Sequence, residues 1–295
     1  MSPGAAAYSE TPHSEPAALE YTRWLATHHY ENFHVVSFLL PKRLRQDFYN
    51  VYAFCRWADD LGDEIGDPQE SLRLLAWWRS ELQAMYRGNA AHPVFVALRN
   101  TVDRCDIPIE PFDRLIRAFE QDQTVTRYQT FEDVFEYCVN SANPVGHLVL
   151  YLCGYRDSER QQLSNYTCTA LQLANFWQDI TVDLEKNRVY LPLDLLSQYG
   201  YTVEDLFALK YDGRFESVMR DALRVADGLF RKGLPLIGMV DRRLALDLEL
   251  FSRGGMKILQ KIRNRRYNVL KSRPHISKAE RVGILLQCLP RLLPF

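Results

Sequence analysis

Apolar side chains recur at three- and four-residue intervals through most of this chain, and that period restricts it to helical folds. Runs in which apolar and polar residues alternate, as in a half-buried strand, are hard to find. Links with proline or glycine, as at Pro41, Pro192 and Gly200, separate the periodic segments. We predict an all-α fold with helices at 17–31, 42–65, 69–87, 92–104, 109–123, 131–153, 158–185, 203–209, 214–236, 239–270 and 278–289.

Several of these helices have start signals in the sequence. Asp67 before Pro68 suits an N-cap followed by proline at the first helical position. Capping-box patterns begin at Thr130, Thr202 and Ser277. No long linker divides the helices, and 295 residues with 47% hydrophobic side chains can bury a sizeable core. We predict one all-α domain at 17–290, a disordered tail at 1–16 and a short C-terminal tail at 291–295.

Composition and motifs exclude several classes of function. The chain has 36 basic and 37 acidic residues, which argues against binding to nucleic acid. It lacks paired Cys/His spacings for zinc, a P-loop and a dinucleotide fingerprint. Six scattered cysteines without a C-x-x-C pair are expected to be reduced core thiols. Because no apolar run reaches about 18 residues, we predict a cytoplasmic protein. The apolar stretch 283–295 leaves docking on the core or contact with a bilayer as alternatives.

A first acidic stripe lies in the segment 52–64. On a helix, Tyr52, Arg56, Asp59 and Asp63 are spaced four, three and four residues apart and share one face. Carboxylates at positions i and i+4 repel each other, and a divalent cation removes that penalty.

A second stripe consists of Gln172, Asn175, Asp179 and Asp183, on a helix that is apolar on most other sides. Buried carboxylates are costly without a partner. Amide and carboxylate oxygens suit Mg²⁺, which takes substrate phosphates as further ligands. Two such stripes facing each other across a bundle would hold a Mg²⁺-diphosphate.

The alternative reading is a solvated helix face. One pair of aspartates at this spacing arises often by chance, whereas two pairs on otherwise apolar helices favour metal binding. Arginines near the stripes, including Arg56 and Arg188, suit phosphate oxygens, although each taken singly is also consistent with a structural ion pair.

The motifs resemble the signatures of the squalene/phytoene synthase family. The first is Tyr52-Ala-Phe-Cys-Arg-x-x-Asp-Asp-x-x-Asp63, and the second runs from Gln172 to Asp183 and is followed by Arg188-Val-Tyr-Leu-Pro192. The helix from Tyr137 to Gly146 is also similar to one in the family. The likeness extends from about Tyr21 to Lys278, with Gln178 standing where many relatives carry arginine.

The resemblance implies a single-domain isoprenoid synthase helical bundle with a central cavity and Mg²⁺ as cofactor. By this resemblance Asp59, Asp63, Asn175, Asp179 and Asp183 hold the metal. Residues implied to contact the diphosphate or to orient ligands are Tyr52, Arg56, Gln172 and Arg188. Those implied to line the isoprenoid pocket are Phe33, Val145 and Gly146.

The segment around Tyr30 and Asn32, together with Asn143–His147 and Arg253–Gly255, resembles the hydroxysqualene synthase branch of the bacterial hopanoid pathway. This branch implies conversion of presqualene diphosphate and water into hydroxysqualene and diphosphate. Asn32 stands where serine lines the site in the phytoene and presqualene diphosphate synthases. Condensation of two prenyl diphosphates and a non-catalytic binding role remain alternatives. Expected partners are the prenyl diphosphate, a membrane surface on the cytoplasmic side and a sister synthase of the same pathway.

Overall fold

The computed structural model describes residues 14–28 and 42–288, which form helices and one isolated bridge between Arg127 and Val189. Within these ranges no strand is present, and the prediction of an all-α fold is confirmed. The predicted tails lie largely outside the described residues. The six cysteines are not joined by disulfides, and three are buried (Cys105, Cys138 and Cys288) while the other three are half-buried. None of the described helices has the length and apolar character needed to cross a membrane.

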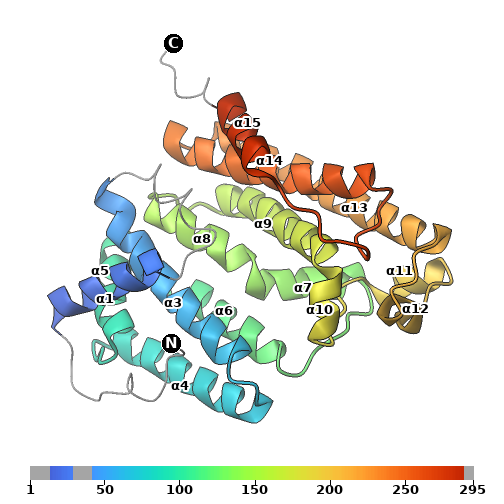
Figure 1. The fold of residues 1–295 in the computed structure, drawn as a ribbon. Coiled ribbons are helices and arrows are strands. Elements are labelled where there is room, and N and C mark those ends of the chain that lie inside the picture. The colour runs from blue at the N-terminus through green and yellow to red at the C-terminus, as the bar shows by residue number, and fades with distance from the viewer. Residues whose placement is uncertain (1–13, 29–41, 289–295) are drawn as a thin grey trace. The chain divides into compact units, whose positions relative to one another are not determined.

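The chain divides into two compact units, residues 1–124 with 144–157, and residues 125–143 with 158–295. The predicted domain at 17–290, with tails on either side, stays a prediction. The first unit contains α1 (Glu15–His28), η2 (Lys42–Leu44), α3 (Arg45–Asp63), α4 (Pro68–Tyr86), α5 (Pro93–Cys105), α6 (Glu110–Gln121) and α8 (Asn143–Leu152). The second contains α7 (Phe131–Ser141), α9 (Ser158–Gln178), α10 (Ile180–Glu185), α11 (Leu193–Gln198), α12 (Val203–Phe207), α13 (Gly213–Gly233), η3 (Leu234–Gly238), α14 (Arg242–Asn264) and α15 (Lys278–Cys288) (Figure 1).

Helix starts agree with the local signals in the sequence. The side chain of Asp67 accepts hydrogen bonds from the backbone at the start of α4. Reciprocal capping boxes open α7 at Thr130, α12 at Thr202 and α15 at Ser277. The start signals are confirmed because a cap depends on residues only two or three positions apart.

Some helix boundaries differ from the prediction. The segment predicted at 131–153 breaks at Ala142, because Pro144 has no N–H with which to continue the ladder. The last long helix ends at Asn264 rather than at 270, since Arg266 and Tyr267 adopt positive φ of 53° and 65°. The six-residue helix α11 was not predicted, and it begins directly after Pro192.

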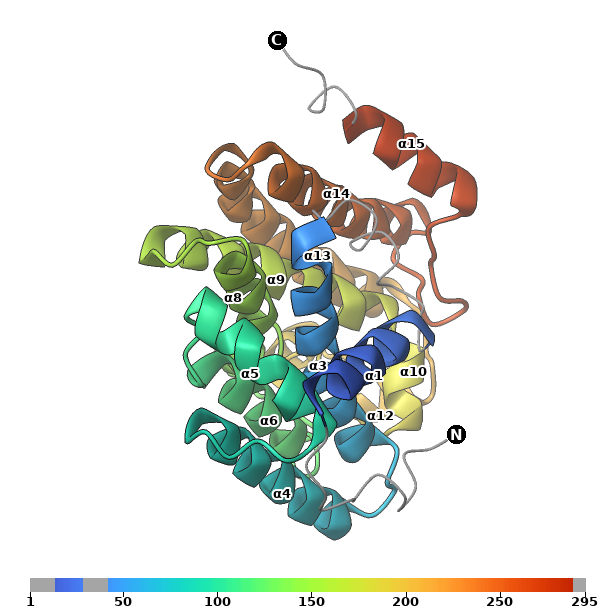
Figure 2. The ribbon, with the colours of Figure 1, turned by 90° about the vertical axis from the view of Figure 1, so that its left-hand side faces the viewer.

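Helix α3 is the central element of the first unit. It packs against α1, α4, α5 and α6, and Figure 2 shows α1 and α5 beside it. Phe54 lies fully buried with its ring centroid 5.7 Å from Trp78 and 4.9 Å from Phe112. On the adjoining face, Asn50 accepts a hydrogen bond of 2.7 Å from Thr22 and donates one of 3.0 Å to Thr101. These contacts hold α3 in one rotational setting and so determine where its acidic stripe points.

Helices α9, α13 and α14 pack together in the second unit, with η3 against α9 and α14 and with α15 on α14. Gly255 permits the close approach of α14, because a Cβ atom there would lie 2.3 Å from Phe230 and 2.9 Å from Leu171. Leu171 directly precedes the second polar stripe on α9. Helix α14 therefore packs against α9 next to the start of that stripe.

Candidate functional site

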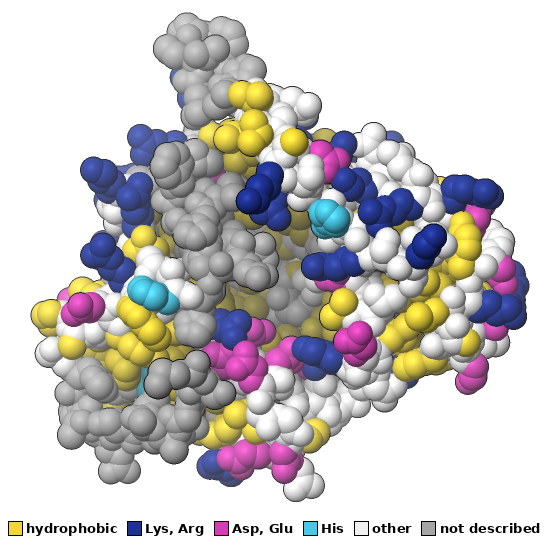
Figure 3. All heavy atoms as spheres, in the orientation of Figure 1, with side chains coloured by type: hydrophobic (Ala, Val, Ile, Leu, Met, Phe, Trp, Pro, Cys, Tyr) yellow, Lys and Arg dark blue, Asp and Glu magenta, His cyan; other side chains and the backbone are white. Residues whose placement is uncertain are grey.

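The first polar stripe occupies the last three turns of α3. Tyr52 is half-buried, the side chain of Asp59 is 46% exposed, and Asp63 is exposed at the last residue of the helix. Burial raises the pKa of Tyr52, with Arg56 opposing that shift. The C-terminal end of a helix carries partial negative charge, so carboxylates at this place favour a bound cation. Figure 3 shows acidic side chains gathered near the end of α3 with a basic one beside them.

Arg56 lies among carboxylates. Its guanidinium is 3.3 Å from Asp59 and 2.8 Å from Glu64, and it also pairs with Asp60. Asp60 is buried, and this burial raises its pKa to about 6 although Arg56 favours the charged form. Asp60 is part of the first motif but was not predicted as a site residue, although its i,i+4 spacing from Arg56 could have indicated the pair. One guanidinium pairs with three carboxylates of this segment, so the negative charge that remains at the end of α3 favours a divalent cation.

The second stripe crosses a helix boundary. We predicted one helix over 158–185, whereas α9 ends at Gln178 and α10 begins at Ile180. Two backbone hydrogen bonds of 2.9 Å, from Asp179 to Asn175 and from Asp183 to Asp179, preserve the i,i+4 spacing through the break. Gln172 is half-buried, Asn175 is exposed, Asp179 is 9% exposed and Asp183 is half-buried. The stripe therefore survives the change of helix.

Asp183 and Arg188 lie together in the second unit. The backbone N–H of Arg188 donates to the carbonyl of Asp183 at 2.8 Å, and both residues line one small pocket. The wall of this pocket includes Phe176 and Tyr190, whose rings stack at a centroid distance of 3.7 Å. The reverse turn after α10 thus brings Asp183 and Arg188, two residues of the predicted site, to the same pocket.

A residue that the sequence analysis did not select also contacts the second stripe. Arg273, between α14 and α15, pairs through Nε with one oxygen of Asp179 and through Nη2 with the other at 2.9 Å. Next to it, the side-chain amide of Gln178 donates to the carbonyl of Pro274 at 2.6 Å. No local pattern could have indicated this pair, because its members are 94 residues apart.

The remaining predicted pocket residues are on α8 or outside the described residues. Val145 is 46% exposed and Gly146 is buried. Phe33 and Asn32 lie outside the described residues. The isoprenoid-lining roles of Phe33, Val145 and Gly146 and the substrate-binding role of Asn32 stay predictions.

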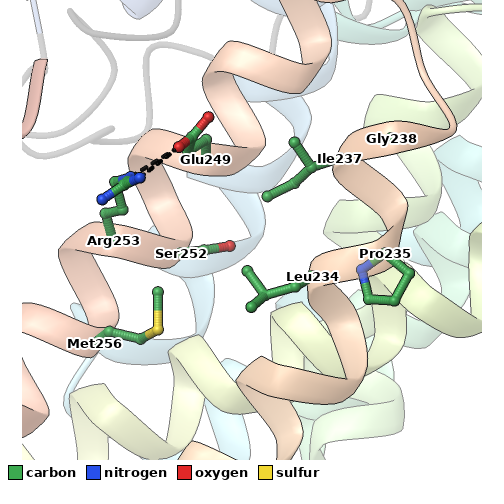
Figure 4. Close-up of a pocket in the computed structure, with 8 residues that line it drawn as sticks. All are labelled: Leu234, Pro235, Ile237, Gly238, Glu249, Ser252, Arg253 and Met256. Atoms are coloured by element: carbon green, nitrogen blue, oxygen red, sulfur yellow. Dashed lines mark hydrogen bonds and ion pairs between the residues drawn. The ribbon is translucent and has the colours of Figure 1, made fainter. Parts of the chain in front are cut away.

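A larger pocket, of about 470 Å³, lies between η3 and α14 (Figure 4). Leu234, Ile237 and Met256 provide apolar walls, and Glu249 forms an ion pair of 2.8 Å with Arg253 at one side. The pocket belongs to the second unit but is lined by η3 and α14, whereas the second stripe lies on α9 and α10. Its single ion pair does not resemble a metal site, so we do not assign metal or diphosphate binding to this pocket.

The donor set of the two stripes suits a hard cation. Asp59, Asp63, Asn175, Asp179 and Asp183 offer only oxygen atoms, the ligand type that Mg²⁺ prefers. Within residues 14–28 and 42–288, no group of three or more His, Cys, Asp or Glu side chains is arranged to hold a metal ion by itself. Mg²⁺ is commonly held by one or two carboxylates together with waters and substrate phosphates, and such a site needs no complete cage.

An all-α chain with two such aspartate stripes has the features expected of an isoprenoid synthase, and comparison with known proteins identifies the family. Residues 26–280 match the squalene/phytoene synthase family model, so the chain belongs to the squalene/phytoene synthase family. It is 33% identical over 258 residues to a phytoene synthase of Thermus thermophilus, covering 87% of each chain. It is also 33% identical over 260 residues to a hydroxysqualene synthase of Sinorhizobium fredii, covering 86% of each.

A solved structure described as squalene synthase HpnC from Alicyclobacillus acidocaldarius has the same fold. Its TM-score is 0.83 with 44% sequence identity, and the match covers 86% of this chain and 96% of that one. The family predicted from the motifs is therefore confirmed, as is the isoprenoid synthase fold.

Proposed function

We propose that this protein is a Mg²⁺-dependent isoprenoid synthase that converts presqualene diphosphate and water into hydroxysqualene and diphosphate. The observation that carries the proposal is the second stripe, whose three oxygen ligands keep their i,i+4 spacing across the break at Asp179. Similarity to the hydroxysqualene synthase and to the HpnC structure supports the choice of reaction.

In this proposal, five side chains hold Mg²⁺, namely Asp59, Asp63, Asn175, Asp179 and Asp183. When bound, the metal supplies charge that stabilises the departing diphosphate. Tyr52, Arg56, Gln172 and Arg188 contact the diphosphate oxygens or orient the metal ligands. Guanidinium forks such as that of Arg188 donate two hydrogen bonds to phosphate oxygens and so position the leaving group.

The proposed reaction balances without a reductant. The carbon–oxygen bond to the diphosphate breaks, and its electron pair leaves with the diphosphate. The hydrocarbon cation rearranges, a water oxygen bonds to it, and the water releases one proton. In this proposal Phe33, Val145 and Gly146 line the isoprenoid pocket and exclude other water from the cation, and Asn32 binds the substrate.

Product analysis tests the proposal. The protein is incubated with Mg²⁺ and presqualene diphosphate in water labelled with heavy oxygen, and the products are identified by mass spectrometry. We expect hydroxysqualene that carries one labelled oxygen, and little turnover of farnesyl diphosphate. The variant Asp179→Asn serves as the control, and it should lose diphosphate release while keeping its folded helical content. Near-normal turnover by Asp179→Asn would refute the metal role.

A second candidate is the head-to-head condensation of two prenyl diphosphates to presqualene diphosphate, squalene or phytoene. The 33% identity to the Thermus thermophilus phytoene synthase favours it, because that match covers 87% of the chain, against 86% for the hydroxysqualene synthase. Turnover of farnesyl or geranylgeranyl diphosphate, with none of presqualene diphosphate, would establish this candidate. Binding of a prenyl diphosphate without turnover would instead indicate a non-catalytic binding or assembly protein, against which the retained aspartates argue.

Peripheral membrane contact, a cytoplasmic location and a sister synthase as partner stay predictions. Helix α15 exposes apolar side chains at Val282, Leu285 and Leu286 beside the basic Arg281. Exposed apolar residues flanked by cations suit an anionic bilayer surface. Co-sedimentation of the protein with anionic and neutral lipid vesicles measures this contact.

A further inference from the structure

The segment 265–277 between α14 and α15, here called the strap, runs from the end of α14 to the second stripe. Val269 is 1% exposed and Leu270 and Pro274 are also buried, so the strap is anchored by apolar contacts. Arg265 donates to the carbonyl of Ser272 at 3.0 Å and to its hydroxyl at 3.1 Å. These contacts hold the backbone immediately before Arg273.

The strap is also joined to the stripe itself. Gln178 donates to the carbonyl of Pro274 at 2.6 Å, directly beside the pair between Arg273 and Asp179. The hydrogen bond from Gln178 and the ion pair of Asp179 involve consecutive residues in both segments. Together they fix the register between the strap and the stripe. The position of Arg273 over Asp179 is therefore set by the backbone on both sides.

This pair has a consequence for metal binding. Asp179 is only 9% exposed, so its charge is costly without a counter-ion, and Arg273 engages both of its oxygens. Mg²⁺ would need the same oxygens, and two cations at one carboxylate repel each other. A diphosphate changes this balance, because its oxygens offer the guanidinium fork a new partner while they also coordinate the metal.

We propose that Arg273 is a positioning residue that occupies Asp179 until a diphosphate arrives, so that Mg²⁺ binds the second stripe tightly only together with diphosphate. The inference rests on the metal role of Asp179 in the proposed function. It makes two predictions of opposite sign for one substitution. Removing Arg273 frees the carboxylate for Mg²⁺ alone, and it removes a partner of the bound diphosphate.

The test uses the full chain and inorganic pyrophosphate as the probe, because every reaction considered above releases it. Calorimetry measures the affinity for Mg²⁺ alone, and then for pyrophosphate at a fixed saturating free Mg²⁺ concentration. The variants are Arg273→Gln and Arg273→Lys, which keeps the charge but lacks the fork. Arg224→Gln is the matched control, since this exposed arginine of the same unit pairs with Asp221 at 2.8 Å on α13. Circular dichroism checks that each variant is folded.

We expect Arg273→Gln to bind Mg²⁺ alone at least about fivefold more tightly than the wild type, and pyrophosphate at least about fivefold more weakly. The two affinities of Arg273→Lys should fall between those of the wild type and those of Arg273→Gln. Arg224→Gln should match the wild type in both measurements. Equal or weaker binding of Mg²⁺ alone by Arg273→Gln overturns the proposal, as does unchanged binding of pyrophosphate. The proposed reaction is tested separately, because failure to turn over presqualene diphosphate leaves these affinities measurable.

Discussion

Asp247 gives the protein a pH-dependent stability that can be worked out from the structure. The residue lies in the second turn of α14, is 4% exposed, and has an Oδ1 atom that is buried without a hydrogen-bond partner. Burial raises the pKa of this carboxyl from 3.8 to about 7, and the charge of Asp241 adds to the rise. The native state therefore holds a proton on Asp247 at pH values where the unfolded chain has released it.

The sign and size follow from proton linkage. Between the unfolded pKa and about 7 the native state binds more protons, so the free energy of unfolding falls as the pH rises through this window. One pKa unit corresponds to about 1.4 kcal/mol, so ionised Asp247 costs at most about 4 kcal/mol above the window. Between about pH 5 and about pH 8 the loss amounts to about 2–3 kcal/mol.

The perturbation is Asp247→Asn, which keeps the shape of the side chain and removes its titration. Urea unfolding followed by far-ultraviolet circular dichroism, at about pH 5 and about pH 8, measures the free energy of unfolding of both proteins. We expect the difference between variant and wild type to grow in favour of the variant by about 2–3 kcal/mol from the lower to the higher pH. The control is Asp103→Asn, which removes an exposed carboxylate paired with Arg99. A difference for Asp247→Asn that does not vary with pH would refute the reasoning.

Three further predictions concern packing, buried polar contacts and the metal. Gly255→Ala should lower the free energy of unfolding by about 1–3 kcal/mol, because its Cβ would lie 2.3 Å from Phe230. Gly254→Ala is the control, since its Cβ would meet open space and the change should be neutral or stabilising. Asn50→Ala should cost about 1–3 kcal/mol in urea unfolding, since it removes the buried hydrogen bonds of Asn50 to Thr22, to Thr101 and to the carbonyl of Ala97. Asn100→Ala on an exposed face should cost little. A chelator should abolish turnover and Mg²⁺ should restore it, and better restoration by zinc in the product assay would contradict an all-oxygen site.

Much of the fold could be predicted from the sequence because its signals are local. The capping boxes at Thr130 and Thr202 depend on residues three positions apart, and both helices begin there. The break at Asp179 could not be predicted, since the apolar period continues through it and local backbone geometry alone interrupts the helix. The end of α14 was also missed, because it is set by the left-handed conformation of Arg266 and Tyr267, neither of which is glycine.

In the candidate site, too, local features could be predicted from the sequence and contacts between distant residues could not. The spacing of Asp59 and Asp63, and of Asp179 and Asp183, could be read from the sequence because a helix places residues four apart on one face. The sequence could not show which cationic side chain pairs with each carboxylate. Arg56 could be assigned to phosphate or to its neighbouring carboxylates, and the structure places it with Asp59, Asp60 and Glu64.

The sequence by itself determined that this chain is helical and that it carries two rows of oxygen ligands at helical spacing. Both properties arise from backbone hydrogen bonds between residues four apart, so they are encoded within short segments. Only the tertiary structure decided that Arg273 lies on Asp179, that Gln178 holds the strap beside it, and that Asp247 is buried. Ion pairs and burial depend on which distant segments meet when the core packs, and no local pattern in the chain specifies that.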